Sequence, residues 1–410
     1  MITGRLRWIV GCWLAVTACG TTDPEHAGRD ATHREATAAA AALPQFERTL
    51  LLEPASETSA NVSIGDVNGD GTLDVVLAKG RHWPLVDRVL LGDGRGHFPA
   101  AHDLGAAADR SYSARLVDLD GDADLDVVVG NDAPDAKVTY LNDGTGLFQP
   151  GSTYGRPEWE TRNVSVADLD GDGRPDLIVA NRGEHSANHI CLNRGNGRFD
   201  ADGIAFSREP ATTITPADFD RDGRIDLAVP HRDGGQSYVY LNGGNAAFSD
   251  QRRVPFGPPD ATIRMAETSD LDGDGALDIV TIDERRGVAV HFGREQGTFA
   301  PGIAIDDGDA TPYALAVGDL NGDGKIDIVV GHVEAPSTVH FNDGTGRRFR
   351  AVRFGDGKGT VYGFAIADLD QDGLADIAAA RSDAPNVVYF ASSAAAHAPR
   401  QPVKTNSEPK

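Results

Sequence analysis

Aspartates on alternate residues of a short, glycine-containing segment are the feature of this sequence that could do chemistry. The segment has the pattern D-x-[DN]-x-D-[GA]-x-x-D, and it begins seven times, at Asp66, Asp118, Asp168, Asp218, Asp270, Asp319 and Asp368. Carboxylates spaced in this way can converge on one point, where they repel one another unless a hard cation neutralises them. Ligation by oxygen alone favours Ca²⁺ over zinc or copper. The sequence therefore predicts up to seven calcium sites.

Each predicted site takes its ligands from positions 1, 3, 5, 7 and 9 of the loop, with the backbone carbonyl serving at position 7. The predicted metal-site residues are Asp66, Asn68, Asp70, Thr72 and Asp74; Asp118, Asp120, Asp122, Asp124 and Asp126; Asp168, Asp170, Asp172, Arg174 and Asp176; Asp218, Asp220, Asp222, Arg224 and Asp226; Asp270, Asp272, Asp274, Ala276 and Asp278; Asp319, Asn321, Asp323, Lys325 and Asp327; and Asp368, Asp370, Asp372, Leu374 and Asp376. Glycine at position 6 permits the sharp turn that brings position 9 back toward the metal. Ala123 replaces this glycine in the second loop, so we expect a weaker or distorted site there.

The residues that flank the loops indicate strands rather than helices. An EF-hand needs Glu at position 12 and a helix on each side. Position 12 is here occupied by Leu77, Val129, Val179, Val229, Thr281, Val330 and Ala379. The flanks are runs of β-branched residues, such as 127–129 and 328–330, which favour strands. Each loop is therefore predicted to join two strands as a hairpin.

The loops belong to a longer repeat, because successive copies begin 49 to 52 residues apart. A third apolar run follows each hairpin, then a glycine-rich turn with an aromatic residue, then a fourth extended segment. The aromatics are Phe98, Phe148, Phe199, Phe248, Phe299 and Phe349. Four strands at this period are typical of a propeller blade. The predicted fold is an all-β, seven-bladed β-propeller of four-stranded blades.

The seventh repeat lacks its aromatic, which the spacing places near residue 398. The segment 46–52 instead precedes the first loop and begins with Phe46. We therefore expect an N-terminal strand to complete the last blade, which closes the ring and removes exposed strand edges.

The N-terminus predicts export. Residues 1–18 carry Arg5 and Arg7 and then an apolar run too short to span a bilayer comfortably. The end of this segment, Val16-Thr-Ala-Cys19, resembles the lipobox of bacterial lipoproteins, which implies that Cys19 becomes the lipidated first residue. An ordinary secretory signal is the alternative. Gly20 follows the cysteine, and by the same resemblance this favours the outer membrane, with the periplasmic or surface side left open. Residues 19–45 are predicted to be a flexible tether, 46–391 the propeller and 392–410 a disordered tail.

These loops and their spacing resemble the FG-GAP/VCBS repeats of integrin α-chain propellers, some fungal lectins and many bacterial secreted proteins. The resemblance covers about residues 46–391, and it implies a propeller with the metal in the hairpin between the first two strands of each blade. The Gly-Ala-Pro element of the family is altered here, as at 132–134, 334–336 and 383–385, and its Phe-Gly pair is not regular. No ligand-binding residue of the integrins carries over.

Recognition is predicted on the face opposite the metal hairpins, where polar residues recur after each second strand. These are Arg81, His82, Asn131, Asp132, Asn181, Arg182, His231, Arg232, Asp283, Arg285, His332 and Arg381, with Trp83, Tyr112, Trp159, Tyr313 and Tyr362 nearby. Aromatic and polar side chains together suit sugars or protein loops; ordinary surface polarity is the alternative for any one of them. Cys191 is predicted to be a buried thiol in the apolar core.

The charge balance limits the partners. The formal net charge of −24 argues against nucleic acid, and we expect contact with a membrane only through the lipid anchor of a monomeric propeller. Three functions remain: a calcium-stabilised, non-enzymatic module that binds a protein or glycan at the cell envelope, a carbohydrate-active enzyme (a polysaccharide lyase or hydrolase), and a purely structural role. We predict the first and expect no catalytic residue.

Overall fold

The structure is a computed structural model that describes residues 43–183 and 187–393. These residues belong to the second of the two units of the chain, Ala42–Lys410. The predicted signal segment 1–18, Cys19, nearly all of the tether and residues 394–410 of the predicted tail lie outside the described residues. No helix in the described part of the chain combines the length and apolar character that a membrane crossing requires.

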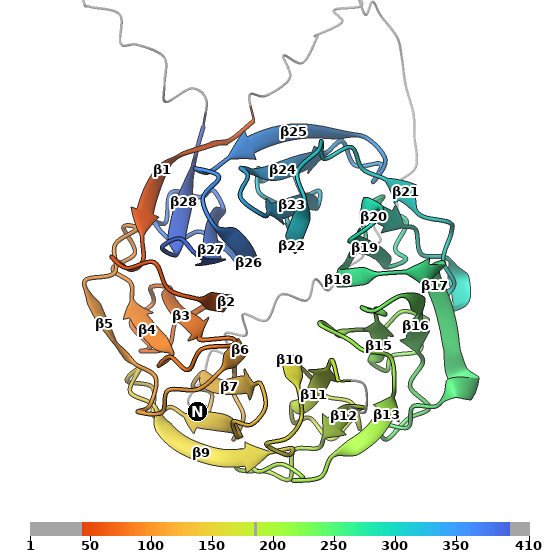
Figure 1. The fold of residues 1–410 in the computed structure, drawn as a ribbon, viewed down its shortest axis with the longest axis horizontal. Helices are drawn as coiled ribbons and strands as arrows, with labels where there is room; N and C mark the ends of the chain where they lie inside the picture. The colour runs from red at the N-terminus through yellow and green to blue at the C-terminus, as the bar shows by residue number, and fades with distance from the viewer. Residues whose placement is uncertain (1–42, 184–186, 394–410) are drawn as a thin grey trace, which may run out of the picture. The chain divides into compact units, whose positions relative to one another are not determined.

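Seven four-stranded antiparallel sheets surround a central axis as the blades of a propeller (Figure 1). The innermost strands are β2 (Ser59–Gly65), β6 (Ser111–Val117), β10 (Thr161–Ala167), β14 (Thr215–Ala217), β18 (Ile263–Ser269), β22 (Pro312–Gly318) and β26 (Thr360–Ala367). The second strands are β3 (Asp74–Lys79), β7 (Asp126–Asn131), β11 (Asp176–Asn181), β15 (Asp226–Val229), β19 (Asp278–Asp283), β23 (Asp327–His332) and β27 (Asp376–Ser382). The predicted fold class is confirmed.

The outer half of each blade is made by two further strands. The third strands are β4 (Arg88–Leu91), β8 (Lys137–Leu141), β12 (Asn188–Cys191), β16 (Gly235–Tyr240), β20 (Gly287–His291), β24 (Ser337–Asn342) and β28 (Val387–Ser392). The outermost strands are β5 (Ala100–Asp103), β9 (Gln149–Tyr154), β13 (Ile204–Ser207), β17 (Arg253–Ala261), β21 (Ile303–Ala304), β25 (Phe349–Phe354) and β1 (Gln45–Leu51). Two short 3₁₀ helices lie at Asp250–Arg252 and Glu295–Gly297.

The core is divided into seven apolar clusters, each between two consecutive blades. Side chains on a strand alternate between its two faces, so one buried second strand supplies two clusters. In β3, Val75 and Leu77 pack toward the last blade, whereas Val76 and Ala78 pack toward the second blade. The near-continuous apolar second strands of the sequence have this physical origin, because both of their faces are covered.

The N-terminal strand closes the ring, as predicted. β1 pairs antiparallel with β28, so the last blade has the order β1-β28-β27-β26. Phe46 packs in the cluster between the sixth and seventh blades, with its ring centroid 5.4 Å from that of Phe354. The six turn aromatics occupy the other six inter-blade clusters in the same way. Phe46 therefore supplies the aromatic that the seventh repeat lacks.

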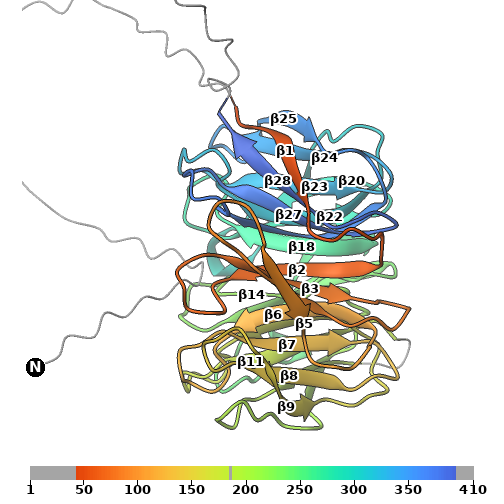
Figure 2. The same ribbon diagram turned by 90° about the vertical axis from the view of Figure 1, so that its left-hand side faces the viewer.

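The strands run between the two faces of the ring, which Figure 2 shows edge-on. Every D-x-[DN]-x-D loop joins an innermost strand to a second strand, so all seven loops lie on one face. The first residues of the innermost strands and the loops after the second strands lie on the opposite face.

Candidate functional site

The aspartate at position 9 anchors each loop to its blade. Asp74 is fully buried, and its two carboxylate oxygens accept hydrogen bonds from the backbone N–H groups of Val67 (2.9 Å) and Gly92 (2.8 Å). The same pair of bonds recurs in the other six loops. Position 1 makes the turn, because its carboxylate accepts the N–H of the residue at position 6, as Asp168 does from Gly173 (2.9 Å). Hydrogen bonds from the backbone thus hold these aspartates in place.

Carboxylate oxygens from different positions converge in most of the loops. In the third, fourth, fifth and seventh blades the aspartates at positions 1, 3 and 9 offer oxygens within 4.8 Å of one another, and in the second blade Asp118, Asp120 and Asp122 do so. The first and sixth loops have Asn68 and Asn321 at position 3, whose amide oxygens are also hard ligands.

Several of these oxygens are buried without a partner, which fits a cation. Oδ1 of Asp66, Asp120, Asp272 and Asp370 is buried and accepts no hydrogen bond from the described residues. An unpaired buried carboxylate oxygen is costly, and a cation between the carboxylates removes that cost. The clusters in the blades could therefore bind metal ions.

Position 7 is chemically varied. The side chains of Arg174, Arg224 and Lys325 turn back onto the position-5 aspartates of their own loops, Asp172, Asp222 and Asp323. Thr72 donates from its hydroxyl to Asp70 (2.6 Å). The second loop has Asp124 there instead, where Asp122, Asp118 and Asp143 add to the effect of burial and raise the pKa of Asp124. That loop carries the densest negative charge and has no basic side chain of its own to offset it.

The loops are also tied to their neighbouring blades. Asn142 follows β8 and donates from Nδ2 both to the carbonyl of Val67 in the preceding loop (2.6 Å) and to that of Leu125 in its own loop (3.1 Å). Asn193, Asn242 and Asn342 make the corresponding pairs of bonds. A change in one of these loops is therefore transmitted across a blade interface.

The second loop has the same backbone conformation at position 6 as the other loops, although this conformation strains the residue there. Ala123 has φ 77°, in the left-handed region that the position-6 glycines of the other loops occupy, such as Gly173 at 84°. A side-chain-bearing residue other than Asn or Asp pays roughly 1–2 kcal/mol for this conformation. The φ of Ala123 therefore shows no distortion of the second loop, contrary to the expectation from the sequence. The strain lies in Ala123 itself.

We expect Ala123→Gly to stabilise the protein by about 1 kcal/mol, because glycine adopts this φ without steric cost although it adds some entropy to the unfolded chain. Gly173→Ala is the matched control and should destabilise by a similar amount, since an added Cβ at Gly173 meets no atom within 4 Å and only the backbone strain changes. Urea unfolding of both variants measures this. If Ala123→Gly destabilised the protein as Gly173→Ala does, the assignment of strain to Ala123 would be contradicted.

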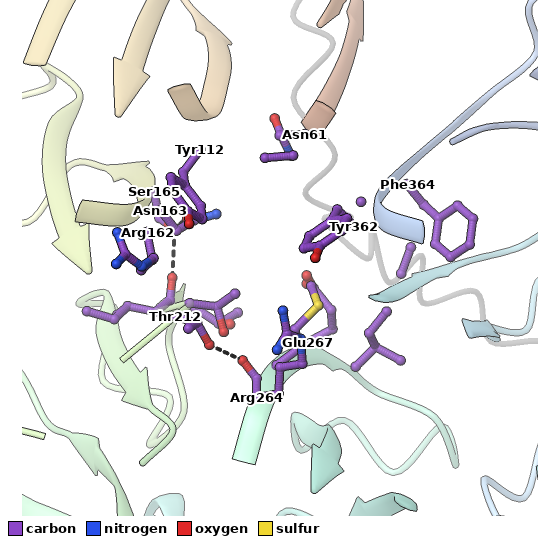
Figure 3. A pocket seen from close by; sticks show the side chains of 18 of the residues that line it. Asn61, Tyr112, Arg162, Asn163, Ser165, Thr212, Arg264, Glu267, Tyr362 and Phe364 are labelled. Carbon is purple, nitrogen blue, oxygen red and sulfur yellow. Dashed lines mark hydrogen bonds between the residues drawn. The ribbon is translucent and has the colours of Figure 1, made fainter. Parts of the chain in front are cut away.

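A cavity of about 710 Å³ lies along the propeller axis and reaches the opposite face, where Arg81, Arg182 and Arg232 line it. Figure 3 shows side chains from several innermost strands pointing into it, among them Tyr112, Arg162, Arg264 and Glu267. Seven of the residues predicted for a recognition face line it: Arg81, His82, Arg182, Arg232, Tyr112, Tyr313 and Tyr362. The structure therefore brings a large part of the predicted set together in one place.

Other predicted residues of this face are structural. Asn131 and Asn181 are fully buried and donate from Nδ2 to the carbonyls of Ala136 (2.7 Å) and Ala187 (2.8 Å), which holds their own loops. Arg381 is buried on Asp356, with Nη1 2.6 Å from the carboxylate. Trp159 is buried and stacks on the ring of His189. These side chains maintain the face but do not present groups to a ligand.

His332 is likewise buried, in a cluster with Asp307 and His340. Its Nε2 lies 2.6 Å from the carboxylate of Asp307, whose other oxygen lies 2.7 Å from Nε2 of His340. Burial alone would raise the pKa of Asp307, but the hydrogen bonds to the two histidines outweigh it and lower that pKa to about 2. The cluster fastens the segment before β22 to β23 and β24.

Four charged cavity residues were missed from the sequence: Arg115, Arg162, Arg264 and Glu267. Arg162 and Arg264 lie six residues before the first aspartate of their loops, and Arg115 and Glu267 lie three before it. Charged residues at fixed offsets before the loops, inside the innermost strands, were the available signal. Glu267 is the one carboxylate among the described residues that line the cavity, and burial raises its pKa to about 7 although Arg115 lowers it.

Cys191 is confirmed as a core thiol. It is fully buried in the cluster between the second and third blades. Burial raises the pKa of its thiol to about 12, so the thiolate that reacts with oxidants or metals does not form at neutral pH.

The FG-GAP-like repeat family matches the chain in six overlapping segments, 66–129, 118–179, 168–229, 218–281, 270–330 and 319–379. Each segment runs from one metal loop through the next. The comparison with curated proteins finds no match.

Solved structures share the fold at low identity. A crystal structure of BBS1N in complex with ARL6DN, soaked with mercury, aligns with TM-score 0.57 and 13% identity over 85% of this chain and 97% of that chain. The rhamnogalacturonan lyase YesW aligns with TM-score 0.48 and 15% identity over 83% of this chain and 75% of that chain. At these identities the likeness concerns the propeller alone.

Proposed function

Because the chain belongs to the FG-GAP-like repeat family, we propose that it is a calcium-stabilised, non-enzymatic binding module that recognises a protein or glycan ligand at the cell envelope. The metal loops act as the scaffold, and recognition takes place on the opposite face. One observation carries this proposal: the cavity at the axis gathers arginine and tyrosine side chains from all seven blades, and Arg81, Arg182 and Arg232 in its lining follow second strands, on the face that carries no metal loop.

Calcium is the ion that the loops fit best. Their donors are carboxylate and amide oxygens on a hairpin, and Ca²⁺ accepts six to eight such ligands in irregular geometry, whereas Mg²⁺ demands a near-ideal octahedron. The position-7 residues differ from loop to loop, so a backbone carbonyl is the ligand we assign at that position.

The family fold supports a docking role. The BBS1N propeller was crystallised with ARL6DN, which illustrates that a propeller of similar fold can hold a partner protein. A glycan is the other candidate, because the cavity offers guanidinium, amide and hydroxyl groups together.

A carbohydrate-active enzyme is the second candidate, and Glu267 favours it. A carboxyl whose pKa is raised to about 7 in a cavity is suited to general acid–base catalysis at neutral pH. Incubating the calcium-loaded protein with a glycan array, and analysing each glycan for shortened or unsaturated products, separates the two. Retention without products supports the binding module, whereas products that vanish in Glu267→Gln identify the enzyme.

We also propose that the protein is exported and anchored through lipid on Cys19, in the outer membrane. Metabolic labelling with a radioactive fatty acid tests this, since label should be incorporated by the natural chain and lost in Cys19→Ser. Protease treatment of intact cells then distinguishes the surface side from the periplasmic side. A soluble, unlabelled natural chain would contradict the anchor.

The loops should give opposite pH dependences with and without calcium. Burial raises the pKa of the position-9 carboxyls, to about 7 for Asp126, Asp327 and Asp376, although two backbone N–H groups lower it. Aspartate in the unfolded chain titrates near about 3.9, so the folded metal-free protein binds more protons in between. Its stability is therefore greatest below the unfolded pKa and is lost as the pH rises through about 7.

In EDTA we expect a higher melting temperature at about pH 5.5 than at about pH 8. In calcium the order should reverse, because protons compete with the metal for the same carboxylates. Calorimetric scans at matched ionic strength measure both. Parallel pH dependences in the two buffers would show that these carboxyls do not hold calcium.

A further inference from the structure

The axial cavity concentrates positive charge in a strongly acidic protein. Its lining includes Arg81, Arg115, Arg162, Arg182, Arg232 and Arg264, whereas the whole chain has a formal net charge of −24. Acidic partners offset part of this charge. Arg162 lies 2.5 Å from Asp132, Arg182 lies 2.9 Å from Asp233, and both Arg232 and Arg264 bind Glu284. With Glu267, six guanidinium groups face four carboxylates, which leaves two positive charges.

Two of the arginines have no acidic group within ion-pair distance. Arg81 makes no ion pair within the described residues, its Nη1 donates to the hydroxyl of Ser382 (3.3 Å), and its Nε is buried without an acceptor. Arg115 has no hydrogen bond or ion pair in the described chain and feels Glu267 only at longer range. Burial lowers the pKa of Arg115, but a guanidinium stays protonated at any physiological pH. These groups lack the anions that desolvated guanidinium groups ordinarily have.

β-bulges aim side chains at the mouth of the cavity. The pairing register shifts near the start of β6, β10, β18, β22 and β26. The residues left unpaired by these shifts are Tyr112, Arg162, Arg264, Tyr313 and Tyr362. A bulge re-aims its side chain relative to the alternating pattern of the strand and is often found beside functional sites. Five blades thus use the same device to place an arginine or a tyrosine at the mouth.

The tyrosines hold the arginines in place across the blade interfaces. The guanidinium carbons lie over tyrosine rings at 3.7 Å for Arg81 on Tyr362, 4.6 Å for Arg162 on Tyr112 and 3.2 Å for Arg264 on Tyr313. A guanidinium stacked on an aromatic face keeps its N–H edges free for a bidentate carboxylate. The donors are therefore pre-organised, which lowers the entropy cost of binding an anion.

The two unpaired arginines lie at different depths. Arg81 is at the mouth, in the loop after β3, next to the bulged residues. Arg115 is three residues further along β6 than the bulged Tyr112, which at about 3.3 Å per residue is about 10 Å deeper along the axis. A ligand that satisfies both arginines must carry at least two anionic groups along its length.

Neutral groups around the axis favour a sugar over a peptide. Nδ2 of Asn61 and Nδ2 of Asn163 line the cavity and donate to no described residue, and the hydroxyls of Ser165, Thr212 and Thr215 point to backbone carbonyls and keep free lone pairs. Trp83, two residues after Arg81, is 70% exposed. An exposed indole close in sequence to a cavity arginine offers a flat apolar surface for the C–H face of a pyranose.

We propose that the axial cavity binds an oligosaccharide that carries at least two carboxylates and enters from the face opposite the metal loops. The inference rests on the proposed binding function and names the chemistry of its ligand. The carboxylates bind Arg81 and Arg115, while the hydroxyls bind the asparagine amides.

The test is isothermal titration of the calcium-loaded protein with trimers of galacturonate, glucuronate and mannuronate. The neutral trimers of galactose, glucose and mannose, the three free monomeric uronates and a triglutamate peptide serve as comparisons. We expect at least one uronate trimer to bind at least about tenfold more tightly than its neutral counterpart and its monomer, because the neutral trimer has no carboxylate for either arginine and the monomer has one carboxylate for two arginines. The affinity should fall as salt is added.

Variants locate the site. Arg81→Gln and Arg115→Gln should each weaken the uronate trimer at least about tenfold, and Arg286→Gln is the control, since Arg286 pairs with Asp260 and Asp283 outside the cavity. If Arg115→Gln does not fold, Arg81→Lys replaces it: this variant keeps the charge but loses the planar fork, and should weaken binding as well. Unchanged melting temperatures establish that the folded site was tested.

The remaining outcomes separate this inference from the proposed function. Equal binding of neutral and uronate trimers, or tighter binding of triglutamate, overturns the acidic-sugar inference and leaves a binding module. Binding of none of the probes overturns the inference and leaves the glycan array to decide the function. A uronate trimer that binds and is cleaved supports the ligand class and overturns the non-enzymatic function.

Discussion

Removing calcium with EDTA should lower the melting temperature by at least about 15 °C. A ligand that binds only the folded state contributes about 2.7 kcal/mol at a concentration 100 times its Kd, so about four saturated sites contribute about 11 kcal/mol. That sum is comparable with the whole stability of a typical protein, about 5–15 kcal/mol. At roughly 1.5–2 °C per kcal/mol for a protein of this size, the shift is at least about 15 °C.

The physical reason lies in the loops. Without a cation, each hairpin holds three to five carboxylates and several leave buried oxygens, such as Oδ1 of Asp120 and Asp272, unpaired. The second loop should loosen first, because Asp124 adds a further negative charge where other loops have arginine, lysine or a neutral residue. The bond from Asn193 to the carbonyl of Leu119 (2.9 Å) then transmits the loss to the third blade.

Differential scanning calorimetry measures this effect, with hydrogen exchange to follow each loop. Excess calcium should restore the transition, and the same concentration of magnesium at equal ionic strength should not. A transition that EDTA leaves unchanged would mean that the carboxylate clusters are tolerated without a metal.

Replacing Phe46 by alanine should cost about 3–5 kcal/mol, as truncation of a buried aromatic in a protein core does. Phe46 is 4% exposed in the cluster between the sixth and seventh blades, although it immediately follows the predicted tether. Its strand covers the edge of β28, and Arg48 stacks on Phe390 at 3.7 Å. Loss of this contact weakens the closure of the ring.

Two matched variants test that explanation by urea unfolding. Phe148→Ala should cost about as much as Phe46→Ala, because Phe148 fills the equivalent place between the first two blades. Leu51→Ala lies on the same strand as Phe46 but is 54% exposed, so it should change stability by at most about 0.5 kcal/mol. If Phe46→Ala costs no more than Leu51→Ala, β1 does not close the ring.

The fold could be predicted from the sequence because every level of the pattern agreed. The loop spacing set the number of blades, the β-branched flanks set the strands, and the missing seventh aromatic pointed to Phe46. Each of these signals depends on local spacing, and the spacing can be recognised because it recurs in successive repeats. The apolar second strands added a further signal, since both of their faces are buried between blades.

The recognition face could be predicted only in part. Arg81, Arg182 and Tyr112 were placed on the correct face, but Asn131, Asn181 and His332 proved to be buried in the loops they stabilise. A polar residue after a strand looks the same in sequence whether it binds a ligand or its own backbone. Arg162 and Arg264 were missed because a β-bulge aims them at the axis, and a one-residue bulge leaves no mark on the spacing of the loops.

The direct test of the account is the calcium content of the protein. After dialysis against buffered micromolar free calcium, inductively coupled plasma mass spectrometry should find five to seven calcium ions per chain, in line with the five three-carboxylate clusters and the two loops with asparagine at position 3. Asp170→Asn together with Asp176→Asn should remove one ion and leave the others. A content below one calcium per chain, in a protein that is nonetheless folded, would contradict the claim that the seven loops are a metal-bound scaffold.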